Sequence, residues 1–139
     1  MENERLVMPV IDNAGLDSRL SEHFGRAPYF MVVEINPEGK VSSVKAVPNT
    51  SEHFGGFGRP PDRILQLKPS AVVTYDMGPR ALNIFQQARV AVLRTTAATV
   101  REVVEAYKRN ELEELTEGCH EARHSTKRDR LALKATKGV

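Results

Sequence analysis

The order of strand-like and helix-like segments limits the folds open to this chain of 139 residues. Short apolar, β-rich runs cover residues 6–11, 29–35 and 40–47, with turn-forming residues between them. Helical patterns at 60–67, 79–88 and from Thr99 onward then alternate with strand-like runs at 71–75 and 90–93. This order predicts an antiparallel hairpin followed by β-α-β units. We therefore expect an α/β fold with a mixed sheet of about five strands and helices on both faces.

The helical patterns also predict which side chains face the core. The second helix would turn four apolar residues inward: Leu82, Ile84, Phe85 and Ala88. The third would bury Val100, Val103, Val104 and Tyr107 along one face. Thr99 and Glu102 have the spacing of a capping box, which marks the start of that helix.

Length and charge predict one folded domain with a basic extension. Charged residues make up 27% of the chain, and the formal net charge is only +2. Residues 120–139 hold six basic and two acidic residues, or +4, so residues 1–119 carry −2. We interpret residues 1–120 as the α/β domain and residues 121–139 as a flexible basic tail, which is more often a solvated extension than a binding arm.

Nothing in the sequence indicates a membrane or an oxidising compartment. No apolar run approaches the length of a bilayer span, and the first residues lack a signal-peptide pattern. The single Cys119 excludes an internal disulfide framework. Both features predict a cytoplasmic protein.

The pentapeptide Ser-Glu-His-Phe-Gly occurs twice, at residues 21–25 and 51–55. The flanking residues differ, so the two copies do not form a repeat architecture. Both lie in turn-rich segments after strand-like runs. We expect two loops of similar chemistry, and the predicted topology could bring residues 49–59 to the same sheet edge as the loop after residue 11, near the carboxyl ends of the parallel strands.

All four histidines and the only cysteine lie in three segments. They are His23, His53, Cys119, His120 and His124. Imidazole and thiolate are ligands for iron and its sulfur clusters. Each histidine alone is better explained as a hydrogen-bonded loop residue, and it is their concentration in three segments that favours a ligand role for the set. One cysteine cannot hold a standard four-thiolate cluster or a cysteine-rich zinc site. A cluster bound here would have few ligands and would be exchangeable, which suits a carrier.

Glycines and arginines accompany these loops and predict contact with an anion. They are Gly25, Arg26, Gly55, Gly56, Gly58, Arg59, Arg63, Gly78 and Arg80. Glycine lets the backbone approach a ligand closely, helix starts bind anions, and arginine neutralises them. Glycine at turns is also the ordinary case, and no nucleotide-binding glycine motif is present.

Asp12 and Asp76 each follow a predicted strand. Acids at neighbouring strand ends can hold magnesium for phosphoryl transfer. The simpler interpretation is that aspartate is favoured in turns and at caps. No third acid accompanies the pair convincingly.

Several of these motifs together resemble the dinitrogenase iron–molybdenum cofactor biosynthesis family, the small NifX/NifY-type proteins. The similarity covers about residues 5–120. It rests on the segment from Ser21 to Phe30 (Ser-x-His-Phe-Gly-Arg-Ala-x-Tyr-Phe), the glycine loop at 55–58, residues 77–82 and Cys119-His120. The resemblance implies a three-layer α/β/α, ribonuclease-H-like fold that binds or shuttles an iron–sulfur or iron–molybdenum type cofactor. It points to His23, Phe24, the loop with His53, and Cys119 with His120.

The first hypothesis is therefore a non-enzymatic carrier or chaperone for a transiently bound cluster, working between metallocluster donor and acceptor proteins. Nucleic acid and membrane are not expected partners. Two alternatives stay open. One is a magnesium-dependent phosphoryl-transfer enzyme using Asp12 and Asp76. The other is a regulatory interaction module whose histidines are structural and whose basic tail meets an acidic partner or nucleic acid.

Overall fold

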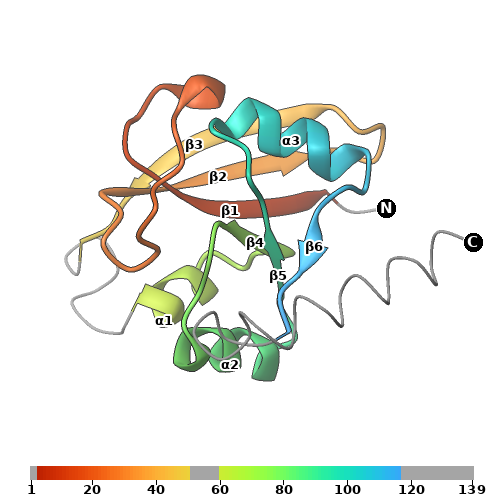
Figure 1. Cartoon of the computed structure of the whole chain (residues 1–139). Helices are drawn as coiled ribbons and strands as arrows, with labels where there is room; N and C mark the ends of the chain where they lie inside the picture. The colour runs from red at the N-terminus through yellow and green to blue at the C-terminus, as the bar shows by residue number, and fades with distance from the viewer. Residues whose placement is uncertain (1–2, 51–59, 117–139) are drawn as a thin grey trace, which may run out of the picture.

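The computed structural model describes residues 3–50 and 60–116 of the chain. Six strands form one mixed sheet in the order β3-β2-β1-β4-β5-β6. Helix α3 lies over one face of this sheet, and α1 and α2 lie over the other (Figure 1). The three-layer α/β/α arrangement is confirmed, whereas the name ribonuclease-H-like stays a prediction.

The central strand is β1 (Glu4–Val10). It pairs antiparallel with β2 (Tyr29–Ile35) and parallel with β4 (Ala71–Thr74). Residues 6–10 are all buried, as expected for a strand with neighbours on both edges and helices on both faces. Sheet pairing changes here from antiparallel to parallel, and β1 and β4 therefore end at the same edge of the sheet.

Side chains alternate between two cores because successive strand residues point to opposite faces. Leu6, Met8 and Val10 pack with Val100, Val103 and Val104 of α3 (Val100–Lys108). Val7 and Phe30 pack on the other face with residues of α1 (Pro60–Leu65) and α2 (Pro79–Gln87), chiefly Ile64, Leu82 and Phe85. The expected inward faces are confirmed for Leu82, Phe85 and the valines, but Ala88 is exposed because α2 ends at Gln87.

Local sequence signals account for most element boundaries. The hairpin of β2 and β3 (Val41–Pro48) turns at Asn36, whose side-chain oxygen accepts hydrogen bonds from the amides of Glu38 and Lys40. Pro79 occupies the first turn of α2, where its missing N–H costs nothing. The capping box of Thr99 and Glu102 forms as predicted.

Several features differ from the sequence-based expectation. Helix α1 ends at Leu65, two residues before the predicted end, and β1 covers Glu4–Val10 in place of residues 6–11. A short 3₁₀ turn covers Gly15–Asp17. Strand β5 (Ala91–Arg94) begins and ends one residue later than predicted. A sixth strand, β6 (Glu113–Glu114), pairs antiparallel with β5. Two glutamates have little β propensity, so tertiary packing and not local pattern places β6.

The described residues include no helix long and apolar enough to cross a membrane. The division between a domain at 1–120 and a tail at 121–139 falls outside the described residues and stays a prediction.

Tyr107 provides a test of how α3 is held to the sheet. Its hydroxyl donates a hydrogen bond to the Glu4 carboxylate. Burial, together with this carboxylate, raises the pKa of Tyr107 from its usual 10.0 to about 12. The folded state thus keeps a proton that the unfolded chain loses above pH 10.0, so this contribution to stability is complete below that pH and is lost as pH rises toward about 12.

We expect Tyr107→Phe to lower stability at neutral pH and to weaken its alkaline decline. Urea unfolding at several pH values between about 9 and 12 measures this. Tyr29→Phe is the control, since the Tyr29 hydroxyl has no hydrogen-bond partner among the residues that the structure describes. Equal pH slopes for the parent and Tyr107→Phe would contradict the assignment.

Candidate functional site

The loop after β1 and the turn after β4 enclose an open hollow of about 550 Å³. This size falls within the usual range for ligand pockets. Its lining comes from three segments: Glu22, His23, Phe24, Gly25 and Arg26; Pro61; and Asp76, Met77, Gly78 and Ala81. Four predicted site residues in the first loop and Gly78 are thus brought together at the carboxyl ends of β1 and β4, as the topology predicted.

Ser21 fixes the backbone of His23. Its hydroxyl accepts a hydrogen bond from the His23 amide at 3.1 Å and donates one to the His23 carbonyl at 3.0 Å. Ser21 is buried while His23 is exposed. The serine of the pentapeptide therefore turns the chain so that the imidazole faces the hollow and solvent, a local use of serine common in turns.

The segment carrying Ser21 is itself held on two sides. The Ser21 amide donates to the Pro9 carbonyl at the end of β1 at 2.9 Å. On the other side, Leu20 donates to Ala98 and Val100 donates to Ser18, both at 3.0 Å. The first loop is thus hydrogen-bonded to the central strand and to the start of α3.

Phe24 anchors the loop to the core below α2. Its ring lies 5.8 Å from that of Phe30, and 5.9 Å from that of Phe85 in an edge-to-face contact. Aromatic pairs in these geometries add stability beyond the area they bury. The backbone of His23 is thus held on its N-terminal side by the Ser21 hydroxyl and on its C-terminal side by the packed ring of Phe24.

Asn49 joins the first loop to the start of the second. Its amide group donates to the carbonyls of Gly25 and Ala27, at 3.1 Å and 2.9 Å, and its oxygen accepts from Arg63 of α1 at 3.0 Å. The chain thus leaves β3 beside Gly25. It re-enters the described structure at α1, which begins at Pro60, and Pro61 of this helix lines the hollow. Both ends of the second loop therefore flank the first.

The start of α2 faces the hollow without a side-chain cap. Gly78 is the N-cap, and its carbonyl accepts the amide of Leu82 at 3.0 Å. Pro79 has no N–H, so Arg80 and Ala81 carry the free amides of the first turn, with no acceptor among the described residues. Such amides favour a negatively charged ligand group.

The side chains of the lining carry mixed charge. Among the described residues of the lining, Arg26 is the only one with a guanidinium group, and Glu22 and Asp76 carry carboxylates. Arg80 begins α2 next to the hollow but does not line it. Burial raises the pKa of the Tyr75 hydroxyl, and the nearby Glu22 carboxylate adds to the effect. The arrangement suits a ligand that carries both positive and negative groups better than a simple phosphate.

Asp12 has the turn role that was its simpler interpretation. It accepts hydrogen bonds from the backbone amide and the side chain of Arg19, at 2.9 Å and 3.1 Å. The hydrogen bond from the Arg19 backbone amide is the main reason that the pKa of Asp12 is lowered. Asp76 instead lines the hollow. Within residues 3–50 and 60–116, no group of three or more histidines, cysteines and acids is placed to hold a metal ion, so nothing there favours the magnesium alternative.

The remaining predicted site residues lie outside the described residues. These are His53, Gly55, Gly56 and Arg59 in the second loop, and Cys119, His120 and His124. Sequence reasoning also missed three contributors to the site. Glu22 stood inside the repeated pentapeptide, whereas Asn49 and Pro61 carry no signal beyond their position next to it.

Comparison with known proteins gives one family. The model of the family described as "Dinitrogenase iron-molybdenum cofactor" matches residues 5–110. An uncharacterized protein of Methanocaldococcus jannaschii, MJ0580, is 26% identical over 111 residues, which cover 78% of this chain and 89% of the relative.

Solved structures share the fold. The crystal structure of PH0822 is 29% identical, with a TM-score of 0.64 over 80% of this chain and 96% of its own. The NMR structure of a Thermotoga protein, TM1290, is 28% identical, with a TM-score of 0.63 over 84% and 97%. The apo form of the orange protein from Desulfovibrio gigas is 20% identical, with a TM-score of 0.67 over 82% and 94%, a likeness of fold alone.

The double hydrogen bond of Ser21 leads to a test of the loop. We expect Ser21→Ala to lower the free energy of unfolding by about 1 kcal/mol and to speed amide exchange at His23, because the hydroxyl no longer holds that peptide unit. Hydrogen exchange followed by NMR measures this. Ser43→Ala, an exposed serine of β3, is the matched control. An unchanged exchange rate of the His23 amide would show that the two Ser21 hydrogen bonds do not hold this peptide unit.

Proposed function

This chain belongs to the dinitrogenase iron-molybdenum cofactor family, and from that premise we propose that it binds an iron–sulfur or iron–molybdenum type cluster, or a precursor of one, and carries it during metallocluster assembly. The cluster is cargo and not a resident cofactor. The protein acts on it by binding and releasing, with no catalytic step of its own.

The position of His23 is the observation that carries this proposal. The side chain is exposed at the hollow, while its backbone is held by Ser21 and its neighbour Phe24 is packed against the core. Because the His23 backbone is already held, binding a metal through its side chain costs less conformational entropy than it would in a free loop. His23 is therefore the proposed ligand among the described residues.

The other groups around the hollow would hold the charged shell of the cargo. Arg26 and the nearby Arg80 supply positive charge, and the free amides at the start of α2 supply hydrogen bonds. Gly25 and Gly78 leave the backbone accessible: an added Cβ at Gly78 would meet no atom within 4 Å. The carboxylates of Glu22 and Asp76 repel negative charge, so they limit how negative a bound ligand can be.

We assign the second loop and the C-terminal segment to the same task. Because Asn49 and Pro61 place both ends of the loop beside the hollow, His53, with Gly55, Gly56 and Arg59, is proposed to complete the site. Cys119, His120 and His124 are proposed as further ligands, used when cargo is received or handed on. The expected partners are donor and acceptor proteins of cluster assembly, in the cytoplasm.

Anaerobic reconstitution with iron and sulfide tests the role of His23. We expect the purified full-length protein to take up iron with charge-transfer absorption in the visible range, and His23→Ala to lose most of this uptake because the fixed ligand is gone. Metal analysis and visible spectra measure both. Equal uptake by the parent and His23→Ala would show that His23 is not a ligand, and no uptake by either protein would overturn the carrier function.

Two variant pairs separate the remaining contributions. Arg26→Gln should weaken uptake, whereas Arg89→Gln, a like change at the far end of α2, should leave it unchanged. The double variant Cys119→Ala, His120→Ala should lower retention if the C-terminal ligands take part. Retention equal to that of the parent would remove them from the site.

A further inference from the structure

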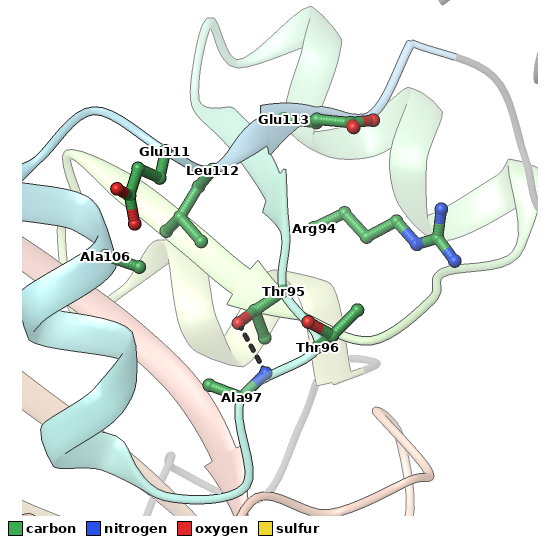
Figure 2. Close-up of a pocket in the computed structure, with 8 residues that line it drawn as sticks. All are labelled: Arg94, Thr95, Thr96, Ala97, Ala106, Glu111, Leu112 and Glu113. Atoms are coloured by element: carbon green, nitrogen blue, oxygen red, sulfur yellow. Dashed lines mark hydrogen bonds between the residues drawn. The ribbon is translucent and has the colours of Figure 1, made fainter.

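A second cavity, of about 370 Å³, lies where β5 ends and β6 begins. Figure 2 shows its lining residues: Arg94, Thr95, Thr96, Ala97, Ala106, Glu111, Leu112 and Glu113. It shares none of them with the hollow around His23.

The cavity exists because β5 and β6 pair over a very short length. The register joins only Leu93 with Glu114 and Arg94 with Glu113, followed by a hydrogen bond from Leu115 to Val92. Past Arg94 the two chains separate, since β5 continues toward α3 while residues 111–112 arrive from the end of α3. Ala106 of α3 lies at the back of the wedge between them (Figure 2).

One wall of the wedge carries donors. Thr95 is 5% exposed, and its hydroxyl oxygen accepts the amide of Ala97 at 3.0 Å, which leaves the hydroxyl proton to donate. Thr96 adds an exposed hydroxyl. Arg94 has no ion-pair partner among the described residues, and its side chain extends outward from Thr95 at the end of the cavity where Glu113 lies (Figure 2).

The opposite wall carries carboxylates and an apolar side chain. Glu113 lies at the same end as Arg94, and Glu111 lies at the other end, with Leu112 between them (Figure 2). Glu111 is held only loosely, by Arg109 at 3.8 Å. Leu112, Ala97 and Ala106 are half-buried and give the cavity a small apolar surface.

We propose that this cavity binds a small zwitterion, an α-amino acid with a short aliphatic side chain. Its carboxylate would bind Arg94 and the threonine hydroxyls, its ammonium group would bind the Glu113 carboxylate at the same end, and its side chain would contact Leu112. A dianion would be repelled by the two glutamates, and a polyamine would be repelled by Arg94. Each is therefore disfavoured by one wall. The proposal is independent of metal binding at the other site.

NMR titration of the full-length, metal-free protein tests this. Alanine and valine are the probes, and acetate and methylammonium each supply one of the two charges alone. We expect saturable shifts of the Thr96, Ala97 and Leu112 amides with valine, and weaker effects with either half. Arg94→Gln should weaken valine binding about tenfold or more, the usual effect of losing a charge-assisted pair, while Arg89→Gln binds like the parent.

Glutamate variants check the other wall. Glu113→Gln should reduce valine binding, and Glu105→Gln, an exposed glutamate of α3, should not. The absence of saturable shifts with either amino acid would overturn the proposal. So would shifts of equal size with acetate alone, or binding unaffected by Arg94→Gln. None of these outcomes involves iron uptake, so a failure of this proposal can be distinguished from a failure of the carrier function.

Discussion

The candidate site depends on the hydrogen bonds that hold residues 18–21 between β1 and the start of α3. The amides of Leu20, Ser21 and Val100 all take part in them. Without these bonds, the segment from residue 11 to residue 28 between β1 and β2 would be a long exposed loop, of a length that is uncommon unless the loop carries a function. With them, Leu20 is bridged to Val10 and Arg19 to Thr99, and the Ser21 amide is bonded to Pro9, so the position of His23 follows from the position of the central strand.

Sheet topology then explains why the hollow forms at this edge. β1 is antiparallel to β2 and parallel to β4, so the chain leaves β1 and β4 at the same side. In open α/β sheets such a change in connection leaves a crevice for ligands. The turn after β4 leads directly into α2, which brings its free amides to the loop that carries His23. Loop and helix start thus meet because of strand order, although 50 or more residues separate them.

The sequence predicted the parts of this structure that rest on local pattern. The strands, the capping box of Thr99 and Glu102, and the buried valines of α3 follow from periodicity and helix chemistry. Strand β6 could not be predicted, because Glu113 and Glu114 pair only through contacts with β5. The pentapeptide identified residues 21–25, but the mixed charge of the hollow depends on Asp76 reaching Glu22 from another strand end, and the link through Asn49 depends on its hydrogen bonds to the first loop.

The same geometry bears on why such a site would release its cargo. A closed metal centre surrounds its ion with four or more protein ligands, which makes dissociation slow. Here the described residues place one histidine, His23, at an open hollow, with the charged side chains of Glu22, Arg26 and Asp76 beside it. Rigid support lowers the entropic cost of binding, while the small number of ligands keeps the binding energy low. A cluster held in this way can be taken up readily and passed to a protein that offers more ligands, as the work of a carrier requires.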